Sequence, residues 1–171
     1  ARVLGAAGHA LDWDDTQVTD DAQHSFGMLM HPTIPPFAAA LAISQMTGPI
    51  DGQRFVLAFV VGFEVECKIS EWMHPDHYLK GMHTSGTVGT FGAYAAAAKL
   101  LRLTGDQLSH GFGIASSMAA GIRCNYGTMT KPLHVGRAAE NGLTAALLAA
   151  RGFTAEKESL DGKWGFFAVH G

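Results

Sequence analysis

Apolar residues in this chain gather in segments of helical length, and no segment alternates convincingly between apolar and polar positions with a period of two. The longest candidate helix runs from about residue 51 to about residue 72, with Asp51 as a plausible N-cap, and His74-Pro75 ends it. The pattern therefore predicts an all-α fold, a bundle of at least five helices without a substantial sheet.

Turn and cap residues set the expected bounds of the other helices. The chain opens with a predicted helix over residues 2–11, and the polar, turn-rich residues 12–33 are expected to form a loop. Pro35-Pro36 can occupy the first turn of a helix that continues to Gly48. Thr104 and Gln107 have the spacing of a capping box. Further helices are predicted over residues 87–103, from 105 to about 120 and from about 135 to 151, with a short helix or turn over 162–169.

Glycine and alanine are unusually frequent inside these predicted helices, as in the series Gly86, Gly89 and Gly92. Each glycine costs roughly 1 kcal/mol relative to alanine within a helix, and close helix packing would offset that cost. A phosphate-binding loop would need a strand, the G-x-G-x-x-G spacing and a helix, and neither the strand nor the spacing is present. The series therefore indicates helix packing.

Composition excludes several classes of protein. With 171 residues, of which 47% are hydrophobic and 16% charged, the chain can build one packed domain and is not disordered. A net charge of −3 and the lack of a Lys/Arg run argue against nucleic-acid binding. The longest apolar stretch, residues 55–63, is too short to span a bilayer. Cys67 and Cys124 lack disulfide-like spacing, so we expect a reduced, cytoplasmic setting.

Lys131 stands in the run Gly-Thr-Met-Thr-Lys-Pro-Leu-His, residues 127–134, ahead of an alanine-rich helix. Pro132 disfavours helical backbone angles at the residue before it. The sequence thus predicts that Lys131 is presented from a defined loop and not from a helix face. Taken alone, such a lysine is more often an ordinary surface residue.

Metal and nucleophilic chemistry find little support in the motifs. His74 and His77 stand close together, but the chain has neither HExxH nor a Cys/His set with zinc spacing, so a structural role is favoured for them. No G-x-S-x-G elbow occurs, and Cys124 is interpreted as a packing residue. We therefore expect no metal and no cofactor.

Metal-free acid–base chemistry remains. Removing a proton next to a carboxylate creates negative charge, so the site needs a base and fixed cations or donors around the oxygens. Suitable side chains are Asp12, His31, Tyr78, His83 and Lys131. Each has a structural alternative when seen singly: a helix cap for Asp12, interior histidines for His31 and His83, and a core aromatic for Tyr78.

Three separated segments favour the functional interpretation of these residues over the structural one. They are His-Ala-Leu-Asp-Trp-Asp-Asp-Thr at residues 9–16, followed by His31-Pro32; residues 77–87, which contain His83-Thr84-Ser85-Gly86-Thr87; and residues 127–134. In this order and at this approximate spacing, the chain resembles the MmgE/PrpD family through essentially all of its length. That family includes 2-methylcitrate dehydratase, cis-aconitate decarboxylase and iminodisuccinate epimerase.

The resemblance implies roles for particular residues. It assigns Asp12, His83 and Lys131 to the site, with Thr16 and His31 as substrate-binding residues, although the loop before His31 is longer here than in many members. Tyr78 stands where epimerase-like members place an acid–base tyrosine. The family's large domain is helical, a smaller α+β lid closes the site, and the enzymes are typically metal-free homodimers. We thus expect residues 1–171 to form one helical domain of a longer protein, without its preceding helices and its lid.

The resemblance favours an enzyme that abstracts a proton beside a carboxylate of a small di- or tricarboxylate. A hydro-lyase like 2-methylcitrate dehydratase comes first, an epimerase second and a decarboxylase third. The expected partners are a carboxylate substrate and a second copy of the chain, with no nucleic acid and no membrane. The alternative class is a non-catalytic, truncated homologue that acts as a scaffold.

Overall fold

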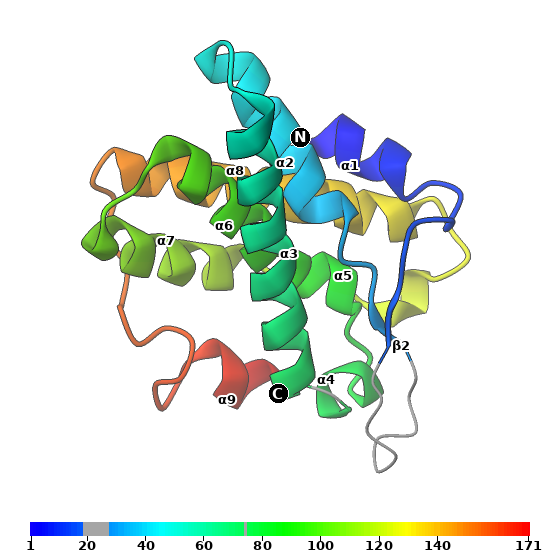
Figure 1. Ribbon diagram of the computed structural model, residues 1–171. Helices are drawn as coiled ribbons and strands as arrows, with labels where there is room; N and C mark the ends of the chain where they lie inside the picture. Colours follow the sequence, from blue (N-terminus) through cyan, green and yellow to red (C-terminus); the bar gives the residue numbers. More distant parts are fainter. Residues whose placement is uncertain (19–27, 74) are drawn as a thin grey trace.

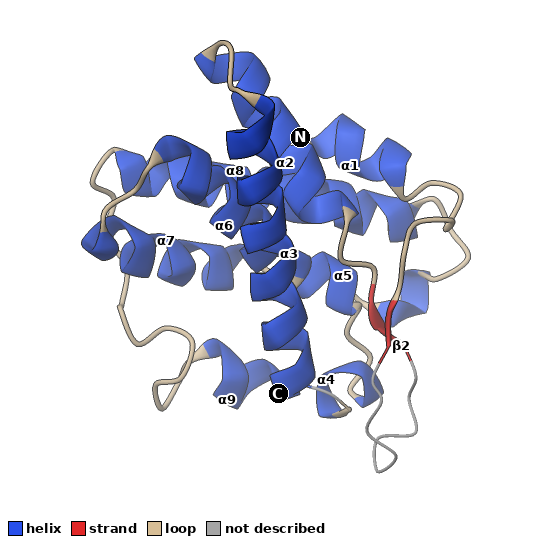
Figure 2. Ribbon diagram, viewed as in Figure 1, coloured by secondary structure: helices blue, strands red, loops and turns tan. Residues whose placement is uncertain are grey.

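The computed structural model describes residues 1–18, 28–73 and 75–171, and it confirms the predicted all-α fold (Figures 1 and 2). The helices are α1 (Arg2–Gly8), α2 (Ile34–Thr47), α3 (Gly52–Met73), α4 (Asp76–Leu79), α5 (Thr84–Thr87), α6 (Gly89–Leu101), α7 (Gly105–Met118), the 3₁₀ turn η1 (Arg123–Asn125), α8 (Thr130–Ala150) and α9 (Phe166–His170).

Helix α6 is the centre of the bundle. Of its residues, Lys99 is exposed, Leu101 is partly buried and the others are buried, which is the pattern of a helix enclosed on nearly all sides. It packs against α8, α3, α2 and α7, and α1 covers the outer side of α8. Tyr94 is fully buried and donates its hydroxyl hydrogen to the carbonyl of Leu108 at 2.8 Å. The core of the domain therefore lies around α6.

The glycines of α5 and α6 make close helix packing possible, as predicted. A Cβ atom on Gly89 would lie 2.7 Å from Cγ of Pro35, and one on Gly86 would lie 2.9 Å from Cβ of His134. A Cβ on Gly92 would overlap the side chain of Glu66. These contacts leave no room for a side chain, which explains why glycine is used despite its helix propensity.

The predicted caps are present. The backbone N–H of Arg54 donates to Oδ1 of Asp51 at 2.9 Å, and Thr104 and Gln107 form the capping box of α7. The helix predicted over residues 87–103 corresponds to α6, which begins at Gly89 directly after the short α5 and is followed by Arg102 in a left-handed conformation.

The loop predicted over residues 12–33 was partly wrong. Strand β1 (Gln17–Val18) pairs antiparallel with β2 (Met28–Met30), and residues 19–27 of that loop lie outside the described part. Tertiary contacts explain the pair: the amide of Gln17 donates to the carbonyl of Cys67, Ser70 donates to Gln17 at 2.6 Å, and Met30 is buried. Anchoring to α3 thus orders a segment whose local sequence favours a loop.

The backbone predicted for Lys131 was also wrong. Helix α8 begins at Thr130, so Lys131 lies in its first turn and not in an extended loop. Proline is tolerated there because the first backbone N–H groups of a helix have no acceptor within it. The turn before α8 is fixed by Thr128, whose Oγ1 donates to the carbonyl of Asn125 and accepts from the N–H of Thr130. These contacts outweigh the bias of a residue before proline.

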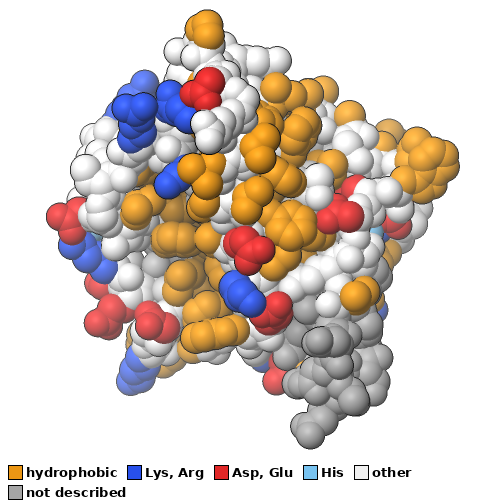
Figure 3. All heavy atoms as spheres, viewed as in Figure 1, with side chains coloured by type: hydrophobic (Ala, Val, Ile, Leu, Met, Phe, Trp, Pro, Cys, Tyr) orange, Lys and Arg blue, Asp and Glu red, His pale blue; other side chains and the backbone are white. Residues whose placement is uncertain are grey.

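One face of the molecule is apolar. Orange side chains gather over α2 and α3 in Figure 3. On these two helices, Phe37, Val56, Leu57 and Val60 are between 41% and 57% exposed. Contiguous apolar patches are uncommon on the surface of monomeric soluble proteins. Within the described residues, none of the helices is both long enough and apolar enough to cross a bilayer.

Glu66 of α3 is a charged residue type inside the core. It is fully buried, and neither carboxyl oxygen has a hydrogen-bond partner in the described part of the chain. Burial raises the pKa of Glu66 well above its usual 4.5, and the nearby charge of Asp15 raises it further. The folded protein therefore keeps a proton on Glu66 at pH values where the unfolded chain has lost it.

This difference predicts a pH-dependent stability. Unfolding releases the proton of Glu66 above about pH 4.5, so Glu66 contributes to the free energy of unfolding a negative slope of up to about 1.4 kcal/mol per pH unit, opposite in sign to the contribution of the buried histidines. Glu66→Gln should remove this slope and unfold at higher denaturant concentration than the wild type at pH 8. Urea unfolding between pH 5 and 8 measures both, with the exposed Glu64→Gln as control. Equal slopes in the wild type and Glu66→Gln would contradict the assignment.

Candidate active site

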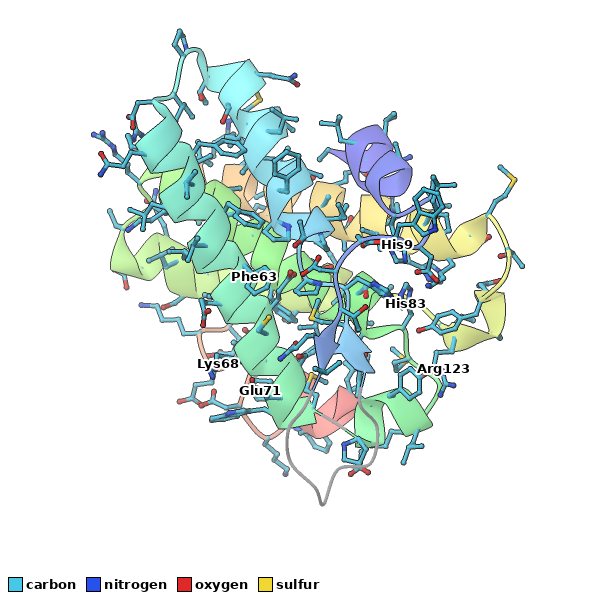
Figure 4. The ribbon with its side chains drawn as sticks, turned by 45° about the vertical axis from the view of Figure 1, so that its right-hand side comes forward. His9, Phe63, Lys68, Glu71, His83 and Arg123 are labelled. Carbon is cyan, nitrogen blue, oxygen red and sulfur yellow. The ribbon has the colours of Figure 1, made fainter. Side chains whose placement is uncertain are left out.

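The candidate residues meet where the end of α1, strand β2, α4, α5, η1 and the first turn of α8 converge. Figure 4 shows His9, His83 and Arg123, which come from three distant segments, on the same side of the molecule. A pocket of about 20 Å³ lies where these elements converge, and it has room for about one water molecule. It is lined by Met30, His31, Tyr78, His83, Thr84, Ser85, Tyr126 and Lys131.

Asp12 and Lys131 form an ion pair between residues 119 positions apart in the sequence. The lysine side chain is 14% exposed and the aspartate side chain 53% exposed, so the ammonium group is the more enclosed partner. The hydrogen bond from Lys131 lowers the pKa of Asp12 below its usual 3.8, and the charges of Lys131 and His31 lower it further. Asp12 is therefore ionised at neutral pH and holds the lysine at the pocket.

The backbone of Asp12 contributes to this placement. Its φ angle is 57°, and among the described non-glycine residues it shares this left-handed conformation with Arg102. Such a conformation costs roughly 1–2 kcal/mol for an ordinary residue, although aspartate tolerates it better than most. The turn after α1 thereby directs the carboxylate toward α8.

His31 is held on three sides. Its backbone N–H donates to Oγ of Ser85 at 2.9 Å, and its Nδ1 lies 3.1 Å from the carbonyl oxygen of Asp15. Because a carbonyl only accepts, Nδ1 must carry a proton, which leaves Nε2 directed to Oδ1 of Asp12 at 3.5 Å. His31 therefore belongs to the Asp12–Lys131 cluster.

His9 and Asp14 complete the cluster. Nδ1 of His9 lies 2.8 Å from Oδ1 of Asp14, and its Nε2 lies 3.6 Å from Oδ1 of Asp12. One nitrogen or carboxylate oxygen from each of His9, Asp12, Asp14 and His31 lies within 4.8 Å of the others, a grouping that the sequence motifs do not indicate. Since Lys131 already contacts Asp12, the protein itself supplies a cation to this cluster.

His83 precedes α5 and is buried against His134 of α8. The two Nδ1 atoms lie 3.0 Å apart, and Nε2 of His83 has no hydrogen-bond partner among the described residues. Burial, followed by the charge of His134, lowers the pKa of His83 to about 2. His83 is therefore a neutral imidazole at any physiological pH.

Tyr78 and Tyr126 form the aromatic side of the pocket. The guanidinium carbon of Arg123 lies 3.5 Å from the ring centre of Tyr78, and its Nη1 donates to the carbonyl of Tyr78 at 2.8 Å. The ring of Tyr126 meets His83 edge to face at 5.0 Å, and Nζ of Lys131 lies 5.3 Å from its centre. Cation–π contacts of this kind help to hold both cations in place.

Thr16 and His77, which the sequence analysis also singled out, do not line this pocket. Thr16 is exposed to solvent. His77 is buried, with Nδ1 2.7 Å from the carbonyl of His170 and Nε2 2.7 Å from Oγ1 of Thr87. That geometry supports the structural role predicted for it, whereas His74 lies outside the described residues.

The whole sequence, residues 1–171, matches the profile of the MmgE/PrpD N-terminal domain. The chain belongs to the MmgE/PrpD family. Cis-aconitate decarboxylase of Homo sapiens is 37% identical over 171 residues, which cover 99% of this chain and 34% of that protein. Its Mus musculus counterpart is 35% identical over the same shares, and the Aspergillus terreus protein is 35% identical over 133 residues, 77% of this chain and 27% of its own length. The chain thus spans about a third of the length of these relatives.

Membership in the MmgE/PrpD family agrees with the resemblance deduced from the motifs, and the structure brings five of the six predicted residues to one place. Asp12, His31, Tyr78, His83 and Lys131 all lie at or beside the pocket. The motifs contained His9, Asp14 and His134 but gave no reason to select them. The contact between His83 and His134 spans 51 positions, which no local spacing reveals, whereas His9 and Asp14 are five positions apart inside the first motif.

Proposed function

We propose that this chain forms the helical part of a metal-independent acid–base lyase that acts on a small polycarboxylate. The observation that carries the proposal is the Asp12–Lys131 ion pair, placed beside two histidines at one pocket. An ammonium group, two imidazole rings and a helix N-terminus offer several donors to the oxygens of an anionic substrate. The pocket would open to admit such a substrate.

The proposed chemistry requires charge stabilisation and proton movement. Removing a proton, or carbon dioxide, from a carbon beside a carboxylate leaves an electron pair that spreads onto the carboxylate oxygens. Lys131 can stabilise that charge or move the proton, and Asp12 keeps its ammonium group in place. The same set of groups serves dehydration, decarboxylation and epimerisation, which differ in what leaves and where the proton returns.

The relatives favour one of these reactions. The human, mouse and Aspergillus relatives are named cis-aconitate decarboxylases, so we place decarboxylation of a tricarboxylate such as cis-aconitate ahead of the dehydration that the motifs ranked first. Epimerisation is the second candidate, because the ring of Tyr78 lines the same pocket as Lys131. We also propose that the protein is a homodimer, in which the apolar face of α2 and α3 is covered.

A single assay separates the candidates. The full-length protein is incubated in deuterated water with cis-aconitate, 2-methylcitrate and a panel of α-substituted dicarboxylates. Carbon dioxide release, water loss and α-carbon deuterium exchange report decarboxylation, dehydration and epimerisation, respectively. We expect carbon dioxide release from cis-aconitate that persists after treatment with a chelator. The absence of all three signals across the panel would support a non-catalytic scaffold.

A further inference from the structure

One hydrogen bond joins His83 and His134, and its direction determines whether Nε2 of His83 presents a lone pair or an N–H group to the pocket. Their Nδ1 atoms are 3.0 Å apart, so one ring donates and the other accepts. If His83 donates, its Nε2 presents a lone pair to the pocket. If His134 donates, Nε2 of His83 carries a proton and presents an N–H group.

We propose that His134 is a positioning residue, which donates its Nδ1–H to His83 and thereby presents the Nε2–H of His83 as a hydrogen-bond donor to a substrate carboxylate. This inference rests on the proposed function, since it takes the substrate to be a polycarboxylate. No motif assigned a role to His134, and it does not line the pocket itself.

Both rings of the His83–His134 pair are uncharged, so one hydrogen atom lies between their Nδ1 atoms. Burial lowers the pKa of both His83 and His134, so both imidazoles are neutral at pH 7. Two neutral imidazoles in contact through Nδ1 have one hydrogen between them. A histidine that is so hard to protonate is also a weak base, and it is better suited to donate a hydrogen bond from its neutral ring.

The surroundings of Nε2 indicate the direction. This atom is buried and has no partner among the described residues, while His83 lines the pocket together with Lys131. A lone pair aimed at an anionic carboxylate would repel it, whereas an N–H group satisfies both the buried nitrogen and the anion. A bound anionic substrate therefore stabilises the Nε2–H tautomer of His83, and this tautomer in turn stabilises the bound anion.

The position of His134 is fixed by close backbone contacts. A Cβ on Gly86 would lie 2.9 Å from Cβ of His134, and one on Gly121 would lie 3.5 Å from its Nδ1. The two glycines let the imidazole approach the backbone of the α5 segment that carries His83.

Three substitutions of His134 test the proposal. Asparagine offers an amide N–H near the position of Nδ1, glutamine places its amide farther out, near the position of Nε2, and leucine has no donor. In the full-length protein we expect His134→Asn to keep kcat within about 3-fold, while His134→Gln and His134→Leu lower kcat by about 10-fold or more and change KM less, because a lost donor acts mainly on developing charge. Equal kcat values in the asparagine and glutamine variants would overturn the proposal.

A second readout needs no substrate. Nitrogen-15 NMR of the full-length protein labelled in histidine reports which ring nitrogen carries the proton, and the His83 signal is identified by its loss in His83→Gln. We expect the Nε2–H form in the wild type and in His134→Asn, and a mixture of tautomers in His134→Gln. An Nδ1–H form in the wild type would overturn the proposal. If no polycarboxylate is turned over but the NMR result stands, the proposed function fails while the His134 contact holds.

Discussion

Lys131→Met in the full-length protein is expected to lower the turnover proposed for it by about 10²-fold or more. The substitution keeps most of the side-chain length and removes the ammonium group that Asp12 holds at the pocket. A positioned acid–base group contributes about 10²- to 10⁴-fold to the rate, and a fixed cation near developing charge contributes comparably. Steady-state kinetics with the substrate found in the deuterated-water assay measure the effect.

Lys99→Met is the matched control for this prediction. Lys99 is the exposed residue of α6, far from the pocket, so its loss should leave kcat within about 2-fold. The unfolding midpoint of Lys131→Met should stay close to that of the wild type, because a partly exposed ion pair contributes about 1 kcal/mol or less. If Lys131→Met turns over the substrate at a near-normal rate, Lys131 is an ordinary surface lysine and the acid–base interpretation of its motif is wrong.

Gly142→Ala is expected to destabilise the domain by about 3 kcal/mol, the largest stability effect predicted for this chain. Gly142 lies on α8 where this helix crosses the central α6. An added Cβ would lie 2.5 Å from the carbonyl oxygen of Thr90 and 2.6 Å from Cβ of Ala93, and it would also overlap the backbone nitrogen of Tyr94. Backbone atoms cannot rotate away as a side chain can, so the two helices must separate.

Gly105→Ala provides the opposite expectation at the start of α7. Nothing lies within 4 Å of a Cβ added there, so alanine should leave stability unchanged or raise it by about 0.5 kcal/mol through its helix propensity. Urea unfolding of both variants, followed by circular dichroism, compares them directly. Similar free energies of unfolding for Gly142→Ala and Gly105→Ala would show that α6 and α8 do not cross as closely as described.

Local sequence determined the helices because their signals are local. Asp51 caps α3 and Thr104 begins α7 as predicted, since a cap requires only residues three positions apart. The glycine series was correctly interpreted as packing, because glycine inside a helix is costly unless a neighbour needs the space. The ordered motifs were also sufficient to identify the family and most of the candidate site.

Tertiary structure decided what depends on distant residues. Strand β1 exists because Gln17 bonds to α3, and Lys131 is helical because contacts at Thr128 outweigh the local preference of a residue before proline. The partners of His83 and of Asp12 lie 51 and 119 positions away, so neither the histidine pair nor the ion pair has a signature in local spacing. The order of the motifs along the chain indicated the candidate residues. The packing of α1, α5 and α8 determined which of them are in contact, and it buries His83 so that its ring stays neutral.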